Sequence, residues 1–339
     1  MKTARYWTAT DNNAVQCELC PHRCLIAEGR RGRCQVRLNQ GGVLLAETWG
    51  HPIAMQVDPI EKKPLNHFLP GTQVFSLGTR GCNLSCRFCQ NWELSHPDRE
   101  RPRTGEVLVP EDVAQWAVTR GIPSVAATYN EPTVWAEYAL DIADACHEKG
   151  VRMVAVSSGY FAEASRLDFF NKMDAVNVDV KSFRDDFYRR LCGARLAPVL
   201  ETLLCIRRET SCWLEVTTLL IPGENDSEAE LDELTAWVAE HLGVDTPLHF
   251  SAFHPAGEMA DVPRTPIATL RRARERALAN GLQHVYVGNL AGQPEGTTTF
   301  CPGCGARLVT REGWGAERDG LDSAGACIQC GRVCAGVWT

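Results

Sequence analysis

The stretch VFSLGTRGCNLSCRFCQN, residues 74–91, joins an apolar run to a loop with three cysteines. The β-branched, apolar start of this stretch predicts a buried strand, and Gly78 and Gly81 allow the backbone to turn closely after it. Iron–sulfur clusters normally take four cysteine ligands, so Cys82, Cys86 and Cys89 can hold three irons of a four-iron cluster. The fourth iron is then free for a substrate or cofactor.

Six further strand-like segments follow this one, separated by helical patterns. They lie at 124–130, 152–158, 175–181, 213–221, 248–254 and 285–290. Alternation of this kind is typical of parallel β/α units. We therefore predict an α/β fold, a partial (β/α)6-type parallel barrel over residues 71–295. Functional groups of such barrels sit at the C-terminal ends of the strands, which places the three cysteines at the catalytic mouth.

Two helices of this barrel have clear end signals. Ser227 and Glu230 form a capping box before an apolar stripe that stops at Gly243. Pro266 opens a second helix, and Gly281 closes it. We interpret both helices as scaffold.

Two more cysteine groups flank the barrel. The first, within an N-terminal module and connector of residues 1–70, has the spacing of a small metal site, either zinc or an auxiliary cluster: Cys17, Cys20, Cys24 and Cys34. The second, over residues 296–339, has the paired spacing of a zinc ribbon: Cys301, Cys304, Cys327 and Cys330. Five cysteines have no assigned role, and we expect most of them to be buried thiols: Cys146, Cys192, Cys205, Cys212 and Cys334.

Composition narrows the class of protein. A net charge of -7 and a pI near 5.8 give no general attraction to nucleic acid or to an anionic membrane. The sequence has neither a signal-peptide core nor an apolar run of the ~20 residues that cross a bilayer. We expect a cytoplasmic protein, and in that reducing compartment its 16 cysteines favour metal ligation over disulfides.

Polar residues follow several predicted strands and are candidates for contacts at the mouth. Asn130 and Glu131 follow the second strand, although a carboxylate at a helix start also has a purely structural explanation. Ser157 ends the third strand, where a turn serine is equally typical. His254 ends the sixth strand, and an isolated histidine at that position is as compatible with structure as with function.

The fourth strand alternates polar residues with valines. Asn177, Asp179 and Lys181 should share one face, while the valines between them share the other. In a barrel with helices outside, the polar face points into the lumen. Either a ligand or a structural ion pair between Asp179 and Lys181 explains such a face.

The connector DPIEKKP, residues 58–64, precedes the first barrel strand. This segment could gate the mouth or bind substrate. A rigid proline-rich connector is an equally good interpretation.

The cysteine triplet, the Asn-Glu-Pro at 130–132 and the Asp-Val-Lys at 179–181 together resemble the radical S-adenosylmethionine superfamily. The barrel is similar to that of pyruvate formate-lyase activating enzymes, which have Gly-Glu-Pro and Asp-Leu-Lys at the corresponding places. This chain has Asn130 at the position of that glycine.

A more specific resemblance covers nearly the whole chain and is to the radical enzyme of the AmmeMemoRadiSam system. Its marks are the CxxCPHxC entry at 17–24, the DPIEKKP segment with His67 and Phe68, the triplet loop and the terminal CPxCG ribbon. This resemblance implies Memo-like and AMMECR1-like partner proteins.

The superfamily resemblance implies an oxidoreductase-type, activating-enzyme-like radical SAM enzyme. Its 4Fe-4S cluster would cleave S-adenosylmethionine reductively, with an external electron donor such as flavodoxin or ferredoxin, and yield a 5′-deoxyadenosyl radical. The residues implied to position the cofactor are Asn130, Glu131, Ser157, Asp179, Lys181 and His254. Two alternatives stay open: an activating enzyme for a glycyl radical enzyme, and a non-catalytic zinc-binding scaffold protein.

Overall fold

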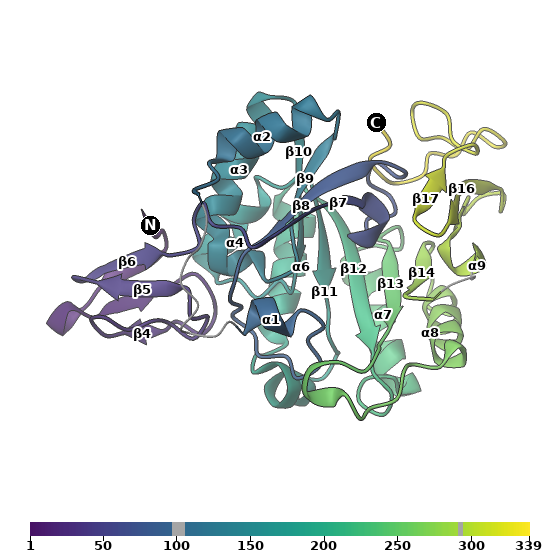
Figure 1. The fold of residues 1–339 in the computed structure, drawn as a ribbon. Helices are drawn as coiled ribbons and strands as arrows, with labels where there is room; N and C mark the ends of the chain where they lie inside the picture. The colour runs from purple at the N-terminus through teal and green to yellow at the C-terminus, as the bar shows by residue number, and fades with distance from the viewer. Residues whose placement is uncertain (97–105, 291–293) are drawn as a thin grey trace.

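A computed structural model describes residues 1–96, 106–290 and 294–339. Its centre is one eight-stranded sheet in the order β14-β13-β12-β11-β10-β9-β8-β7 (Figure 1). The strands are β7 (Ala54–Pro59), β8 (Gln73–Gly78), β9 (Ser124–Ala127), β10 (Arg152–Ser157), β11 (Ala175–Asp179), β12 (Trp213–Leu220), β13 (Leu248–Ala252) and β14 (Val285–Gly288).

Strands β8 to β14 pair in parallel, and β14 and β7 are the free edges of a sheet that stays open. This arrangement confirms the predicted α/β partial barrel and all seven predicted strands. The strands end one to three residues earlier than predicted, because the polar residues at their ends leave the sheet for the mouth loops. The antiparallel edge strand β7 was not predicted.

The two faces of the sheet differ in chemistry. Val176, Val178 and Val180 are fully buried in the main core, on the side where Phe75 stacks on Trp116 of a covering helix. Asn177 lies on the opposite face and donates to a connector carbonyl. The predicted alternation along β11 is therefore confirmed.

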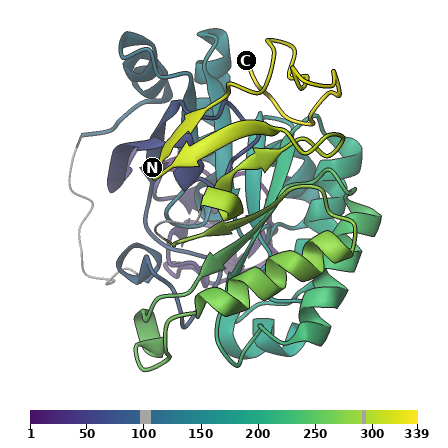
Figure 2. The ribbon, with the colours of Figure 1, turned by 90° about the vertical axis from the view of Figure 1, so that its right-hand side faces the viewer.

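Helices cover the outside of the sheet (Figure 2). The α-helices of the described residues are α1 (Trp92–Ser95), α2 (Pro110–Thr119), α3 (Ala136–Glu148), α4 (Glu163–Phe170), α5 (Asp185–Phe187), α6 (Ala197–Glu209), α7 (Glu228–His241), α8 (Ile267–Ala279) and α9 (Pro294–Thr297), of which α1 lies near the C-terminal ends of the strands. Both predicted helices form: the Ser227 hydroxyl accepts from Glu230 N at the start of α7, and α8 follows Pro266. No helix within the described residues is long and apolar enough to cross a membrane.

Two small modules flank the sheet at different places (Figure 1). The N-terminal module, drawn in purple, has two three-stranded sheets built from β1 (Lys2–Thr3), β2 (Trp7–Ala9), β3 (Val15–Cys17), β4 (Leu25–Ile26), β5 (Arg37–Gln40) and β6 (Val43–Ala46). The C-terminal module, drawn in yellow, contains β15 (Thr299–Phe300), β16 (Arg307–Glu312) and β17 (Gly315–Glu317). It lies near the N-terminal ends of the barrel strands, whereas α1 lies near their C-terminal ends.

The connector after β7 closes the floor of the barrel. Ile60, Leu65 and Phe68 form one buried cluster with the first inward residues of the strands, among them Val74. Because Pro59 pairs with Gln73, the connector begins at the N-terminal end of β8. The segment therefore has the structural role of a connector, one of the interpretations that the sequence left open, and its Asp58 and Lys63 also reach Tyr129 after β9.

A buried ion pair fastens the N-terminal module to the barrel. The Arg37 guanidinium on β5 makes two hydrogen bonds to Glu137 on α3, at 2.9 and 2.6 Å. Their side chains are 1% and 0% exposed. Removing one partner of such a pair leaves an uncompensated charge in the interior.

We expect Glu137→Ala to lower the free energy of unfolding by about 3–5 kcal/mol, measured by urea denaturation. Asp186→Ala is the control, since its pair with Arg190 is solvent-exposed, and it should cost less than about 1 kcal/mol. Equal losses in the two variants would contradict a role for burial.

Candidate active site

The cysteine triplet lies where the sequence predicted, on the loop after β8 at the C-terminal ends of the strands. Three backbone hydrogen bonds fix this loop: Gly81 N to Leu94 O at 2.8 Å, Ser85 N to Cys192 O at 2.9 Å and Arg87 N to Leu191 O at 2.9 Å. Their partners belong to α1 and to the segment after α5. The loop is thus held by its own chain.

Asn130 clamps the start of this loop. Its Oδ1 accepts from Thr79 N at 2.9 Å, and its Nδ2 donates to Gly81 O at 2.8 Å and to Thr79 Oγ1 at 3.1 Å. A glycine at this position would make none of these bonds. Asn130 therefore positions the cysteine loop through its side chain.

Glu131 joins the ends of β9 and β10. Its carboxylate accepts from Thr133 N, Thr133 Oγ1, Ser157 Oγ and Ser158 N at 2.7 to 3.2 Å. It caps the 3-10 helix Pro132–Trp135, so the helix-start interpretation is correct for its local role. Burial, together with the Glu131 charge, raises the pKa of Cys82 well above its usual value.

The two serines after β10 differ in whether their hydroxyl groups have hydrogen-bond partners. The Ser157 hydroxyl donates to Glu131 and accepts from Gly159 N at 3.0 Å. The Ser158 hydroxyl is buried and has no hydrogen-bond partner among the described residues. Ser158, rather than the predicted Ser157, has a free polar group near the mouth.

Asp179 and Lys181 form the ion pair that the sequence offered as one interpretation, with Nζ and Oδ2 2.6 Å apart. Burial opposes the Lys181 charge, but Asp179 and the Cys86 thiol outweigh it and raise the pKa of Lys181. Contact with the Cys192 thiol and burial raise the pKa of Cys86 well above its usual value. The pair therefore lies beside one of the three loop cysteines. Cys192 is a neighbour that the sequence did not identify.

His254 lies farther along the rim, after β13. Its Nε2 is 3.4 Å from Asn289 O, in a half-buried position. The loop that follows does reach the cysteines, because Glu258 N donates to Arg87 O at 2.7 Å. The structure thus gathers Asn130, Glu131 and the Asp179–Lys181 pair around the triplet and leaves His254 apart from them.

Below the mouth, Tyr129 meets two charged residues of the connector, the segment that the sequence left open as a candidate substrate binder. Tyr129 donates its hydroxyl to Asp58 at 2.6 Å, and Lys63 Nζ contacts the same carboxylate at 2.8 Å. Although burial opposes the Asp58 charge, these two donors hold the pKa of Asp58 well below its usual range. Tyr129 has φ +71, a conformation that side chains rarely adopt. The signal for this group was the DPIEKKP segment.

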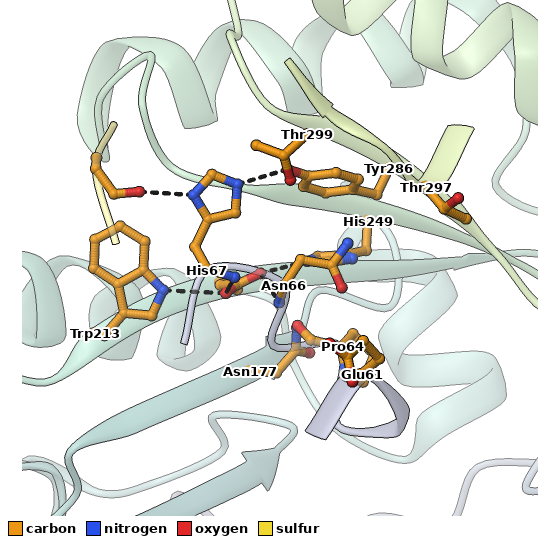
Figure 3. A network of polar contacts seen from close by, with 12 residues as sticks. Glu61, Pro64, Asn66, His67, Asn177, Trp213, His249, Tyr286, Thr297 and Thr299 are labelled. Atoms are coloured by element: carbon orange, nitrogen blue, oxygen red, sulfur yellow. Dashed lines mark hydrogen bonds and ion pairs between the residues drawn. The ribbon is translucent and has the colours of Figure 1, made fainter. Parts of the chain in front are cut away.

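The floor of the barrel is built around the buried Glu215. Figure 3 shows the surrounding network, in which Asn66, His67, Trp213 and His249 are labelled. Its carboxylate accepts from the backbone N–H groups of Asn66 and His67 at 2.9 and 2.7 Å, and from Trp213 Nε1 at 3.1 Å. His249 Nε2 lies 2.7 Å from the same carboxylate. Hydrogen bonds to this one buried carboxylate therefore join the connector to strands β12 and β13.

His67, His284 and Cys334 form a second buried group near this floor, with ligand atoms within 4.8 Å of one another. His67 Nδ1 contacts Ala335 O at 2.7 Å, so it carries the proton, and Tyr286 OH donates to Nε2 at 2.5 Å. Both ring nitrogens of His67 are therefore occupied, and we interpret the group as packing.

The C-terminal cysteines stand around a common centre. Cys301 and Cys330 Sγ are 3.6 Å apart, Cys304 and Cys327 Sγ are 3.7 Å apart, and all four thiols lie within 4.8 Å of one another. Four thiolates at ~2.3 Å from one tetrahedral ion stand about 3.8 Å apart. This group fits a single metal ion.

The N-terminal cysteines line one cavity together: Cys17, Cys20, Cys24 and Cys34. Burial raises the pKa of Cys20 to about 12 and that of Cys34 to about 11. The five other cysteines are buried, as predicted.

Comparisons with known proteins agree with this geometry. The pattern of the Radical SAM superfamily matches residues 76–235. An uncharacterized protein of Methanocaldococcus jannaschii is 42% identical over 98% of both chains. The benzylsuccinate synthase activating enzyme of Thauera aromatica is 25% identical over 40% of both chains. SuiB of Streptococcus suis, solved with S-adenosylmethionine, shares the fold with a TM-score of 0.50 and 15% identity, over 68% of this chain and 53% of its own.

We expect Asn130→Ala to lower the free energy of unfolding by about 2–3 kcal/mol, because it leaves buried groups of the cysteine loop without partners. Asn91→Ala, which removes one exposed bond to Tyr129 O from the same loop, is the matched control and should cost under about 1 kcal/mol. Chemical denaturation monitored by circular dichroism measures both. Similar losses would contradict the clamp.

Burial lowers the pKa of His284 from 6.5 to about 4. The folded state therefore binds fewer protons than the unfolded state between these values, and stability falls as the pH falls. His284→Phe removes this dependence, so the stability advantage of the wild type over this variant should shrink by about 3 kcal/mol from pH 7 to pH 4. Denaturation at several pH values measures it, and parallel profiles would refute it.

Proposed function

Because the chain belongs to the radical SAM superfamily, we propose that it holds a 4Fe-4S cluster at Cys82, Cys86 and Cys89 and cleaves S-adenosylmethionine reductively. The observation that carries this proposal is the cysteine loop, fixed by its own chain at the barrel mouth with three thiols and no fourth cysteine ligand in the loop. When bound, the cluster supplies the electron that splits the cofactor into methionine and a 5′-deoxyadenosyl radical, which takes a hydrogen atom from the substrate.

The residues around the loop would bind and orient the cofactor. Glu131 provides a buried negative charge for its ammonium group, in a carboxylate already fixed by four donors. The Ser158 hydroxyl offers a free polar group beside it. Asp179 and Lys181 offer two charges next to Cys86. A site held this rigidly excludes water and loses little entropy on binding.

The lumen below the mouth would receive a polar substrate. Thr217 Oγ1, and Asn177 Oδ1 one step closer to the floor, are buried without a hydrogen-bond partner among the described residues. Buried polar atoms are usually paired, so these two atoms support a polar ligand or ordered water in this space. The Asp58–Lys63–Tyr129 group adds charged and hydroxyl contacts.

We propose that the four C-terminal cysteines bind zinc. Their spacing supports one tetrahedral ion, and four thiolates are a usual ligand set of structural zinc.

A second candidate concerns the identity of the substrate. The likeness to benzylsuccinate synthase activating enzyme favours a glycyl radical enzyme as the partner that loses the hydrogen atom. Mixing the loaded protein with such an enzyme and recording its glycyl radical by electron paramagnetic resonance tests this candidate.

We expect the anaerobically purified protein, dithionite and S-adenosylmethionine to yield 5′-deoxyadenosine, measured by liquid chromatography and mass spectrometry. Cys86→Ala should reduce the yield to background, because it removes one of only three cluster ligands on the loop. Cys205→Ala, at a buried thiol on α6, is the matched control and should keep the wild-type yield. Absence of 5′-deoxyadenosine from iron-loaded wild type would refute the proposal.

A further inference from the structure

The N-terminal cysteine group, Cys17, Cys20, Cys24 and Cys34, has a geometry of its own. All four line one cavity, and each of the other three thiols influences Cys20 electrostatically. The strand β3 supplies Cys17, and a turn closed by Cys17 N to Cys24 O at 2.9 Å brings Cys24 back beside it. The fold thus gathers four cysteines that are far from the triplet in sequence.

The spacing of these thiols differs from that of the C-terminal group. Within the described part of the chain, the C-terminal thiols form a group within 4.8 Å, whereas no three of the N-terminal thiols do. Thiolates on a four-iron cluster point outward from the corners of a cube and lie roughly 6 Å apart. Those on a single zinc ion are about 3.8 Å apart. The wider spacing of the N-terminal thiols favours a cluster over a single zinc ion.

The thiols of the triplet can be compared with those of the two flanking groups. Among the described residues, Cys82, Cys86 and Cys89 likewise form no group within 4.8 Å. In this respect the N-terminal group resembles the triplet and differs from the C-terminal group.

A buried cation lies at the same cavity. Arg37 is 1% exposed and lines the cavity, and both of its Nη atoms bind Glu137. Its Nε is buried without a partner among the described residues. Cys17 and Cys34 are close enough to influence the Arg37 charge. Four thiolates around a cluster carry net negative charge, and an unpaired N–H donor beside them stabilises it.

The cavity also adjoins the catalytic loop. Asn83, which follows Cys82, lines it, and His22 Nε2 lies 2.7 Å from Asn83 O. At Gly81, a side chain would come within 2.5 Å of Cys34 O, so the two loops touch through their backbones. Arg33 Nη2 also donates to Ser85 at 3.2 Å. The N-terminal cysteine site is therefore in direct contact with the loop that carries the triplet.

We propose that Cys17, Cys20, Cys24 and Cys34 ligate a second 4Fe-4S cluster, held against the loop of the first. That the neighbouring loop holds a first cluster rests on the proposed function. The ligation of the second cluster by the N-terminal cysteines does not. Every iron of this second cluster has a cysteine ligand, so no iron is open to substrate. The role of the second cluster is therefore limited to electron transfer or to stabilising the fold of the N-terminal module.

The decisive variant replaces Cys82, Cys86 and Cys89 by alanine together and leaves the N-terminal group intact. Anaerobically purified, the full-length variant should contain about four iron, about four sulfide and about one zinc per chain, with the Mössbauer spectrum of a four-iron cluster. Iron-free protein, or about two zinc per chain, would overturn the proposal.

The converse variant replaces Cys20 and Cys24 by alanine. Iron should fall from about eight per chain to about four, while zinc stays at about one. Cys205→Ala, the matched control, should retain about eight iron. Unchanged iron with lost zinc would assign zinc to this site and overturn the proposal.

The two proposals fail differently in these measurements. If the triplet binds no cluster, the wild type and the triple-alanine variant both contain about four iron, and the N-terminal cluster stands. If the N-terminal group binds none, the wild type contains about four iron and the triple-alanine variant contains none.

Discussion

The buried charge of Glu215 is the constraint on which the arrangement of the barrel depends. A carboxylate in the interior is costly unless several donors satisfy it, and its donors here come from the connector and from strands β12 and β13. The connector cannot leave the floor without exposing or orphaning that charge. His67 extends the same network to Ala335 in the C-terminal module.

Buried polar groups at the two ends of the barrel are satisfied to different degrees. At the floor, Glu215 and His67 have hydrogen-bond partners within the chain, and apolar side chains fill the space beside them. Glu61 Oε2 and Ser124 Oγ in the same lower part of the barrel, and the hydroxyls of Ser158 and Thr217 toward the mouth, are buried without partners among the described residues. Buried polar atoms are usually paired, so these atoms favour ordered water or a ligand. The position of the cysteine loop at the C-terminal ends of the strands supports chemistry at the mouth.

The sequence predicted the strands well because short apolar segments alternate with helical patterns along the chain, which is typical of parallel β/α units. It predicted the mouth residues as a set, since the C-terminal ends of parallel strands meet at one edge. It could not predict how each side chain is used. The side-chain amide of Asn130 holds Gly81, a contact that no pattern in the sequence indicated, because it depends on a partner far away in sequence. The ion pair of Asp179 and Lys181 was one of the interpretations that the sequence left open.

The sequence by itself determined the family, the partial barrel and the position of the triplet, because spacing and periodicity are properties of the chain alone. Only the tertiary structure decided that the connector closes the floor and that Cys192 lies beside Cys86. It also showed that the C-terminal thiols lie within 4.8 Å of one another, whereas no three of the N-terminal thiols do. The distance between thiols depends on how turns and strands fold together, and it bears on whether a site suits one ion or a cluster.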